Sequence, residues 1–494
     1  MTSARLAWPS RPRRVGAPPR GDASSLLVAG ALLGSLAATA PLGGCKVGPD
    51  YATPIVDMPG GFAEARKTFA DAPPQAAQLV GWWQTFGDAT LEDLVVRAIG
   101  SNLDLRIAQQ RVFEARGLRR VVAADFYPQI SALGSFDRSR QSENVVESPG
   151  FDPGPSNVWD GSFDANWELD VFGRTQRAVE AASADIKAAE ALQRDTLVTL
   201  VAEVARNYAE LRGFQRRLEL AAQNAAQQRD SVALTDSRYR AGLTSELDVA
   251  GARAQLSATE AALPLFRQGI AAASHRLGVL VGEPPEALVD ELAVPAPIPV
   301  GPSNIDPGPP EELLQRRPDL RRAQELAAAA CARIGVATSE LYPRFFLLGS
   351  VGLAAQDFSD VFESASRTYS FGPSITWKVF DGGRIRGNIA VEDARFEQAQ
   401  LAYRRTVLTA LEEVENALAA HRHDQESERL LADAVESNQL RVALATDRYE
   451  RGIGDFLSVL DAQRALTIAE DDLARTRQDV AIDLISLYKA LGGV

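Results

Sequence analysis

Few side chains in this sequence have the type and spacing that chemistry requires. The 494 residues include two cysteines, Cys45 and Cys331, and three histidines. Two thiols cannot form a disulfide framework or a cysteine-rich zinc site. His421 and His423 are two positions apart on an expected helix, so they face different directions and lack the i, i+4 spacing of helical metal ligands. Since we also find no P-loop, nucleophile elbow or zinc signature, we expect no enzyme activity, no metal and no cofactor.

The charge and composition exclude a further class. The chain carries 52 Lys and Arg against 65 Asp and Glu, a formal net charge of −13, and 46% of its residues are hydrophobic. A protein that binds nucleic acid through phosphates needs a surplus of basic side chains, and a basic cluster occurs only in the first twenty residues. We therefore expect a folded, acidic protein that does not bind nucleic acid.

The N-terminus has the pattern of an export signal. Arginines in the first twenty residues precede an apolar stretch from Leu26 to Pro41, and small residues then lead into Cys45. This order is typical of a secretory signal peptide, and the apolar part is too short for a stable membrane span. We expect residues 1–44 to be removed. They hold five Arg and one Asp, so the chain from Cys45 onward carries −17 rather than −13.

The two cysteines have different expected roles. Leu42-Gly43-Gly44-Cys45 resembles the bacterial lipobox, in which the cysteine is acylated and becomes the new N-terminus. The alternative is an ordinary signal peptide in which Cys45 is incidental. Cys331 lies in an alanine-rich segment expected to be helical, where it is most simply a small buried packing residue.

The chain from Cys45 onward repeats one plan twice. Matches at an offset of 215 are Asp104-Leu105-Arg106 with Asp319-Leu320-Arg321 and Tyr127-Pro128 with Tyr342-Pro343, and matches at 210 are Arg238-Tyr239, Gly242, Leu247 and Ala252 with Arg448-Tyr449, Gly452, Leu457 and Ala462. This period is too long for a solenoid and indicates a duplicated half. Residues 283–311 between the halves are rich in proline, which blocks helix and marks a connector.

Each half is expected to contain a helix, two strands, a very long helix and a further helix. The expected helices are rich in Ala, Leu, Gln, Glu and Arg and cover 91–126, 174–240, 243–281, 312–341, 384–450 and 454–490. The longest would span roughly 100 Å at about 1.5 Å per residue. Pro264 should kink or interrupt one of them.

Small residues recur at heptad spacing along the helix expected over 174–240. They are Ala181, Ala184, Ala188, Ala191, Val198, Ala202, Ala205 and Ala209, with Asp195 as the exception. Such a seam predicts close helix packing of the coiled-coil type. A related rhythm of Ala394 and leucines from Leu401 to Leu418 occurs in the second half.

Period-two alternation predicts the strands. Apolar and polar residues alternate over 159–171 and again over 369–379, and the less regular partner strands are expected at 128–139 and 343–356. Polar loops over 140–156 and 357–368 would join each pair. A soluble sheet with one buried face would give the same alternation. The length of the runs, which exceeds the roughly 9–11 residues of a membrane-crossing strand, and the aromatic residues on the apolar face favour a membrane barrel.

A barrel of this kind would need several copies of the chain. Four strands leave open edges with unpaired backbone groups, which lipid does not tolerate, so transmembrane strands require an oligomer. The physics permits a dimer, a trimer or a larger ring. The polar residues of the run 159–171 include Asp160, Asp164, Glu168 and Asp170. We expect these carboxylates to line the lumen and favour cations.

Several short motifs occur along the chain after Cys45. They are Val47-Gly48-Pro49-Asp50-Tyr51, Trp82-Trp83-Gln84, Phe86-Gly87-Asp88, Asn102-Leu103-Asp104-Leu105, Arg316-Arg317-Pro318-Asp319-Leu320-Arg321, Ala332-Arg333-Ile334-Gly335-Val336-Ala337 and Leu460-Asp461-Ala462-Gln463-Arg464. Together they resemble the motifs of one family, the outer-membrane factors of tripartite efflux systems. The likeness covers the whole chain after residue 44 and is greatest to TolC-like lipoproteins of the NodT and OprM type.

The resemblance implies a fold and an assembly. The fold would be mainly α with a transmembrane β-barrel: a homotrimeric TolC-like duct whose protomers give four strands each to a 12-stranded barrel, above a long periplasmic α-helical barrel. Residues 45–90 and the connector 283–311 would form a small mixed equatorial region, between the repeats 91–282 and 312–494. Lys46 after Cys45 favours sorting to the outer membrane of a Gram-negative bacterium, with the lipid anchor on its periplasmic side.

The resemblance also assigns roles to individual residues. Asp461 matches a ring of carboxylates at the periplasmic mouth, and Leu457 matches an apolar constriction one helical turn earlier. The alternative is that Asp461 is a solvated helix residue. The first half has Gly251 at the equivalent place and offers no second carboxylate. The turns at Tyr239, Gly242, Tyr449 and Gly452 would be tips that contact an adaptor, with glycine permitting a left-handed helix cap.

The implied function is passive exit of small molecules, such as drugs and toxic compounds. An inner-membrane transporter, of the RND type by this resemblance, would supply the energy, and a periplasmic adaptor would link it to this protein. One alternative is the outer component of a peptide or protein secretion system. Another is a coiled-coil scaffold lipoprotein without a pore. The sequence names neither the exported compound nor the pump.

Overall fold

A computed structural model describes residues 45–68, 75–76, 79–142, 154–303 and 305–493 of the chain. The expected signal peptide, 1–44, and most of the loop 140–156 therefore lie outside the described residues. The major helices are α2 (Ala89–Ser101), α3 (Leu103–Ala123), α4 (Arg174–Arg240), α5 (Glu246–Leu280), α7 (Pro318–Ser339), α8 (Arg384–Glu450) and α9 (Phe456–Ala490). The longer strands are β2 (Gln129–Arg140), β3 (Pro155–Leu169), β5 (Arg344–Ala355) and β6 (Arg367–Thr376).

The shorter elements lie mainly around the N-terminal segment and the connector. They are α1 (Ala63–Thr68), α6 (Leu313–Arg316), the paired strands β1 (Gln75–Ala76) and β4 (Ile305–Asp306), and 3-10 turns at Trp82–Phe86, Ala124–Phe126, Pro310–Glu312, Phe358–Asp360 and Ser364–Ser366. None of the helices in the described part of the chain is both long and apolar enough to cross a membrane.

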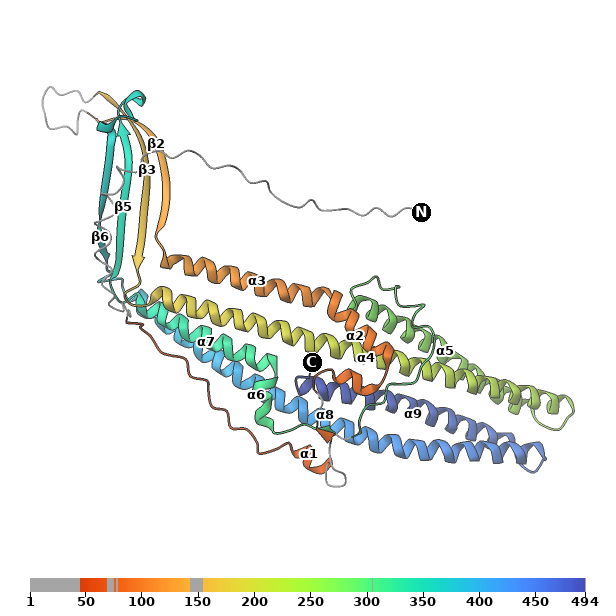
Figure 1. Cartoon of the computed structure of the whole chain (residues 1–494). Helices are drawn as coiled ribbons and strands as arrows, with labels where there is room; N and C mark the ends of the chain where they lie inside the picture. Colours follow the sequence, from red (N-terminus) through yellow and green to blue (C-terminus); the bar gives the residue numbers. More distant parts are fainter. Residues whose placement is uncertain (1–44, 69–74, 77–78, 143–153, 304, 494) are drawn as a thin grey trace, which may run out of the picture. The chain divides into compact units, whose positions relative to one another are not determined.

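The two-copy plan of the sequence is confirmed by the order of elements. The helices α4 and α8 have 67 residues each and begin and end where the sequence predicts, and α5 and α9 have 35 residues each. In each copy a helix leads into a β-hairpin, which leads into the long helix and its shorter partner (Figure 1). The strands lie at one end of the long helices and the helical hairpin turns at the other (Figure 1).

The four longer strands form one antiparallel sheet in the order β2-β3-β5-β6. The hairpins β2-β3 and β5-β6 are the equivalent units of the two copies, and pairing of β3 with β5 joins them. Phe163 in the middle of β3 lies opposite both Ala132 and Val351, and Val351 lies opposite Tyr369. The outer edges of β2 and β6 have no strand partner among the described residues.

Three sequence expectations about helices are corrected. The helix expected over 91–126 divides at Asn102, whose backbone leaves the helical region and whose side chain accepts from Leu105 N at 3.0 Å. The helix expected over 312–341 divides before Pro318. Pro264 does not interrupt α5, which continues through it. Packing of α5 along α4 outweighs the backbone hydrogen bond that the proline removes.

The seam of small residues is buried, as the sequence predicts, in the first copy. All eight alanine and valine positions of the seam on α4 are buried, and α4 packs closely against α7. The equivalent rhythm on α8 behaves differently, because Leu401 and Leu408 are more than half exposed. Sequence-equivalent helices thus have different partners within one chain.

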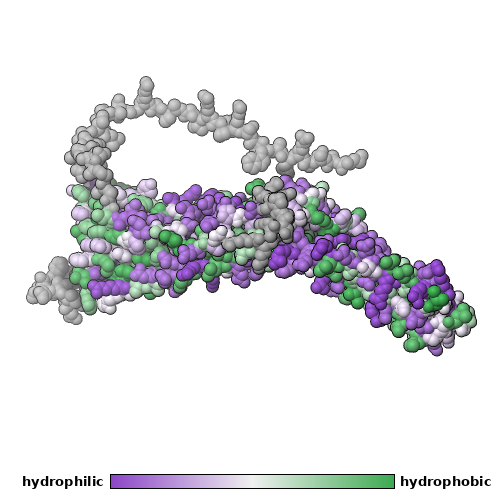
Figure 2. All heavy atoms as spheres, turned by 90° about the horizontal axis from the view of Figure 1, so that it is seen from below, coloured by the Kyte–Doolittle hydropathy of each residue, from purple (hydrophilic) through white to green (hydrophobic). Residues whose placement is uncertain are grey.

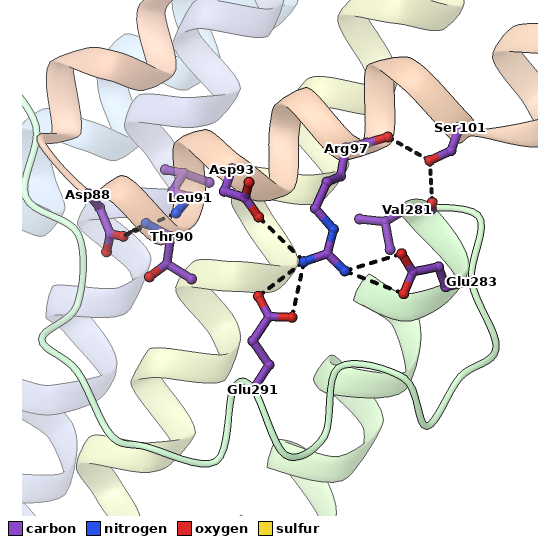
Figure 3. A network of polar contacts seen from close by, with 9 residues as sticks. All are labelled: Asp88, Thr90, Leu91, Asp93, Arg97, Ser101, Val281, Glu283 and Glu291. Carbon is purple, nitrogen blue, oxygen red and sulfur yellow. Dashed lines mark hydrogen bonds and ion pairs between the residues drawn. The ribbon is translucent and has the colours of Figure 1, made fainter. Parts of the chain in front are cut away.

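The hydrophobic core lies where the N-terminal segment and the connector meet the helices. Trp82 is fully buried and stacks on Tyr488 of α9, with 5.0 Å between ring centroids. Arg97 of α2 fastens the connector there, since its guanidinium lies 3.0 Å from Glu291 and 3.2 Å from Glu283 (Figure 3). These contacts tie residues 283–311 to the first copy.

Candidate functional site

The sheet has two chemically different faces. Directly opposed residues of antiparallel strands share a face. The pairing therefore places Asp160 with Ser135 and Asp164 with both Ser131 and Ser350 on one face, which is largely polar. Phe346 and Leu348 interrupt the alternation of apolar and polar residues in β5. Both lie on this polar face, opposite Glu168 and Asn166.

The other face of the sheet is apolar and uncovered. It carries Ile130, Ala132, Phe136, Trp159, Phe163, Ala165, Trp167, Leu169, Phe345, Leu347, Val351, Leu353, Tyr369, Phe371 and Ile375. Phe163 is 62% exposed and Phe371 is 83% exposed, so the described residues leave most of each open to solvent. In Figure 2 hydrophobic residues are frequent over the end of the molecule that carries the strands. A patch of this size and composition is typical of contact with lipid or with a protein.

The four predicted lumen carboxylates do not form one group. Asp160 and Asp164 lie within β3 on the polar face. Glu168 lies on the same face but forms ion pairs with Arg174, at 3.3 Å, and with Arg344. Asp170 follows the last residue of β3, and its carboxylate accepts from the backbone N–H of Gln176 at 2.8 Å in the first turn of α4. The placement of Asp170 on the strand is thus wrong, because the strand ends at Leu169.

Two tryptophans mark equivalent places at the base of the hairpins. The indole N–H of Trp167 donates to the carbonyl of Phe126 at 2.9 Å, and that of Trp377 donates to the carbonyl of Leu341 at 3.0 Å. Both acceptors precede the first strand of their hairpin, so each bond ties the end of a hairpin to its start. Amphipathic indoles at this position are typical of a boundary between apolar and aqueous surroundings.

Cys45 is exposed and lies beside the junction of the sheet and the helices. Two residues later, Val47 N donates to the carbonyl of Phe172, between β3 and α4, at 3.3 Å. The guanidinium of Arg177, whose side chain is 1% exposed, donates to the carbonyls of Val47 and Gly48, each at 2.9 Å. The chain that follows Cys45 is therefore fixed, while the thiol itself is accessible.

These hydrogen bonds of Arg177, which we call the Arg177 clamp, hold the segment that contains Gly48 of the Val47–Tyr51 motif. A Cβ on Gly48, whose φ is +87°, would lie 2.4 Å from the Cα of Gly335. Only glycine fits this close backbone approach. Asp50 pairs with Arg177 at 3.0 Å, and this contact holds the pKa of the Asp50 carboxyl below its ordinary value. Nearby, Cys331 is buried in α7, as expected for a packing residue, and burial raises the pKa of its thiol.

Both helical hairpin turns have the backbone that the sequence predicts. Gly242 and Gly452 adopt φ of +70° and +75°. Gly242 N donates to the carbonyl of Tyr239 at 2.9 Å, and Gly452 N donates to that of Tyr449 at 3.0 Å. With the bonds from the next residue to Arg238 and Arg448, each turn is a Schellman cap, which requires a left-handed residue that glycine supplies.

The two tip tyrosines have different surroundings. Tyr239 is 42% exposed, whereas Tyr449 is 4% exposed and packs on Phe456 with 5.3 Å between ring centroids. The guanidinium of Arg238, from the first hairpin, lies 4.4 Å from the ring centroid of Tyr449. The prediction that the side chain of Tyr449 contacts an adaptor at the surface is therefore wrong, because the other hairpin covers this side chain.

Asp461 and Leu457 lie on one exposed face of α9, one helical turn apart. Neither makes a hydrogen bond or ion pair within the described ranges, so both side chains are available to face a channel axis. The equivalent residue of Leu457 in the first copy, Leu247, is likewise exposed on α5. The repeat pairs Leu247 with Leu457 at an offset of 210, but the sequence led us to expect the apolar constriction at Leu457 alone.

The two histidines of α8 have different surroundings, since the side chain of His423 is exposed and that of His421 is not. His421 is buried, and it lines a cavity of about 820 Å³ between the connector and the helices α4, α8 and α9. Burial lowers the pKa of its imidazole. Across the parts of the chain that the structure covers, no group of three or more His, Cys, Asp or Glu side chains is placed to hold a metal ion.

Residues 94–283 and 310–493 match the family described as outer membrane efflux protein. The chain is 32% identical to the probable efflux pump outer membrane protein TtgC of Pseudomonas putida, over 93% of this chain and 95% of the relative. It is 33% identical to the outer membrane protein OprJ of Pseudomonas aeruginosa, over 92% and 93%. The solved outer-membrane channel OprN superposes with a TM-score of 0.84 at 37% identity, over 91% of this chain and 99% of OprN. With both repeats matched and the fold shared, the chain belongs to the outer membrane efflux protein family.

Proposed function

We propose that this protein is the outer-membrane duct of a tripartite efflux pump and gives small molecules a passive exit. The observation that carries the proposal is the sheet, which has an exposed apolar face backed by a polar face, at one end of long helices. A membrane strand needs this combination, with one face toward lipid and the other toward a lumen. The relatives named as efflux pump outer membrane proteins support the same role.

The strands form a barrel when several copies combine. The edges of β2 and β6 each carry unpaired backbone groups, which cannot remain open in lipid. Within the chain β3 pairs with β5, and the equivalent pairing between chains joins β6 of one copy to β2 of the next. The family favours a homotrimer, in which four strands from each copy give a barrel of twelve.

The contacts between helices of neighbouring copies can be derived in the same way, from the equivalent contact within one chain. Within the chain α4 packs against α7, and their equivalents in the other copy of the plan are α8 and α3. These two helices carry apolar residues that the protomer leaves exposed: Leu103, Ile107, Leu118 and Val121 on α3, and Val391, Leu401 and Leu408 on α8. Packing of α8 against α3 of the next copy would bury both sets and close a ring of helices of the coiled-coil type.

The lipid anchor fits the proposed membrane boundary. Acylation of Cys45 would place the acyl chains beside the base of the hairpins, where Trp167 and Trp377 lie. The anchor would then enter the periplasmic leaflet of the outer membrane next to the barrel, and the helices would extend into the periplasm. The clamp at Arg177 would fix the distance between the anchor and the barrel.

The gate belongs to the far end of the helices. In a trimer Asp461 forms a ring of carboxylates, and Leu457 forms an apolar ring one turn nearer the tip. Leu247, at the equivalent place in the other hairpin, would complete the apolar ring as a set of alternating leucines. Of the two equivalent positions Asp461 is the one that carries charge, because the other is Gly251.

The helical tips would receive the periplasmic adaptor that links this duct to an inner-membrane transporter, which we propose to be of the RND type. The turns at Gly242 and Gly452 are exposed. The residues that follow the two glycines, Leu243 and Ile453, are apolar and exposed as well. Tyr239 remains accessible in the protomer, whereas Tyr449 contributes by supporting its turn.

An efflux assay tests this function in cells. Deletion of the gene should raise the susceptibility of the host to the toxic compounds that its pump exports, and the full-length chain should restore resistance. The variant Asp461→Ala, expressed at normal abundance, is compared with the full-length chain because it alters the proposed gate. Loss of a secreted peptide or protein with unchanged susceptibility would favour the secretion alternative. If the deletion causes neither defect, the result would favour a scaffold without a pore.

A further inference from the structure

One contact joins the tips of the two helical hairpins within the protomer. Arg238, in the last turn of α4, reaches across to the second hairpin, where its guanidinium covers the ring of Tyr449 at 4.4 Å. Its Nη1 also donates to the backbone carbonyl of Tyr449 at 2.7 Å. The arginine thus combines a cation–π contact with a hydrogen bond to a carbonyl in the last turn of α8. Phe456 also packs on the tyrosine, with 5.3 Å between ring centroids.

The second hairpin carries the same two residue types in the same backbone. Arg448 and Tyr449 follow Arg238 and Tyr239 at an offset of 210, and both pairs precede a Schellman cap with matching hydrogen bonds. Yet at these tips only the pair of Arg238 and Tyr449 is in contact within the described residues. The side chain of Arg448 is exposed and makes no hydrogen bond or ion pair in the described part of the chain, and Tyr239 is 42% exposed.

The equivalence of the hairpins indicates where the unused residues point. Arg238 extends from the first hairpin toward the second. Arg448 occupies the same position on the second hairpin, so it extends in the same rotational sense, away from the first hairpin. Tyr239, by the same relation, presents its ring on the side of the first hairpin that the second does not cover. Each is therefore half of a contact that one chain cannot complete.

We propose that Arg448 of one copy of this chain stacks on Tyr239 of the next copy and donates to its backbone carbonyl. The inference rests on the ring-shaped oligomer of the proposed function and assigns a specific contact to its boundary. The same arginine–tyrosine contact then joins every pair of adjacent hairpins around the mouth, alternately within and between chains. Both tip tyrosines are covered, which leaves Leu243 and Ile453 as the exposed apolar residues for an adaptor.

Crosslinking between differently tagged chains tests the contact. One chain carries Tyr239→Cys and the other Arg448→Cys, and the two are co-expressed and treated with a short thiol-specific bifunctional reagent. We expect a crosslinked dimer that contains both tags. Each variant expressed alone should give none, which controls for Cys45 and Cys331. The matched pair Arg238→Cys and Tyr449→Cys should crosslink within one chain that carries both, and not between separate chains.

A second measurement uses the stability of the assembled oligomer to heat in detergent. Arg448→Gln and Tyr239→Leu should each lower the temperature at which it dissociates, whereas Tyr239→Phe should not, because the ring remains. Arg451→Gln is the control at the same tip, since Arg451 pairs with Asp447 of its own chain at 2.8 Å.

The outcomes separate the contact from the oligomer. An intact oligomer without the mixed crosslink, and with unchanged dissociation in Arg448→Gln, would overturn the contact and leave the duct. A chain that remains monomeric in mild detergent and in the membrane would overturn the oligomer itself, and the contact with it.

Discussion

At the scale of single residues, the structure gives Cys45 a fixed neighbourhood and a free thiol. Arg177 holds the two residues that follow Lys46, and the close approach of Gly48 to Gly335 leaves no room for sliding. An acyl chain attached at Cys45 would therefore start from a defined place beside the sheet. This geometry supports a lipid anchor over an incidental cysteine.

We predict that Cys45→Ser abolishes incorporation of labelled palmitate into the protein. The modification needs the thiol of Cys45, and the only other cysteine, Cys331, is buried. Metabolic labelling followed by immunoprecipitation measures this directly. Cys331→Ser is the control and should label like the parent chain. Undiminished labelling of the Cys45 variant would remove the lipid anchor from the account.

Asp483 of α9 gives a second residue-scale prediction. Burial, followed by the charge of Asp424 on α8 and a hydrogen bond with it, raises the pKa of Asp483 from 3.8 to about 7. The folded chain thus keeps a proton that the unfolded chain releases between about pH 4 and 7, so this group makes the protein less stable as the pH rises through that range.

We predict that Asp483→Asn raises the thermal midpoint at pH 8, by a gain on the order of 1–2 kcal/mol after allowance for solvent screening. The difference from the parent should shrink toward pH 4, where both side chains are neutral. Thermal unfolding in detergent at the two pH values measures it. Asp433→Asn, on the exposed surface of α8, is the control. An equal effect at both pH values would contradict the assigned proton.

At the scale of elements, the sheet explains why its strands alternate so regularly. Within the described residues no helix lies over either face, yet one face is polar and the other apolar. A soluble sheet would bury its apolar face against helices, and here the helices continue beyond the base of the sheet (Figure 1). The exposed apolar face therefore favours lipid contact.

We predict that arginine is tolerated on one face of β3 and not on the other. Phe163→Arg, in the middle of the apolar face, should cost about 2–4 kcal/mol in a bilayer. Its neighbour Ser162→Arg, on the polar face, should cost much less. The yield of heat-stable oligomer from outer membranes compares them. Equal yields would mean that the apolar face does not meet lipid.

The sequence predicts elements well where the signal is local. The bounds of α4 and α8 follow from long runs of helix-forming residues between glycines, and the strand pairs follow from alternation. The break at Asn102 was missed because its side chain also donates to the carbonyl of Leu280, 178 residues away. The different burial of Tyr239 and Tyr449 could not be predicted either, because the two share the same local sequence and differ only in which hairpin lies beside them.

At the scale of the whole molecule, the duplicated plan leaves one set of surfaces incomplete. The edge of β6, the apolar stripe of α8 and the side chain of Arg448 belong to the second copy, and their equivalents in the first copy are all occupied. A ring of chains with the same relation between neighbours completes all three at once. This agreement is the strongest argument for a closed assembly.

We predict that the assembled channel prefers cations. Asp160 and Asp164 lie on the polar face and have no arginine partner among the described residues, whereas Glu168 pairs with two arginines. Asp160→Asn combined with Asp164→Asn should move the reversal potential in a salt gradient toward zero. Glu168→Gln should change it less. A parent channel with equal cation and anion permeability would contradict this assignment of the face.

The most direct test of the central claim is the conductance of the purified oligomer in a planar bilayer. Asp461 lies on an exposed face one turn from Leu457, so we expect Asp461→Ala to widen the mouth and give a stable conductance several-fold above that of the parent channel. The matched variant Asp433→Ala, exposed on α8 away from that turn, should conduct like the parent. Stable steps that grow in the Asp461 variant would support a gated duct. A correctly assembled oligomer that passes no current, even with Asp461 replaced, would contradict it.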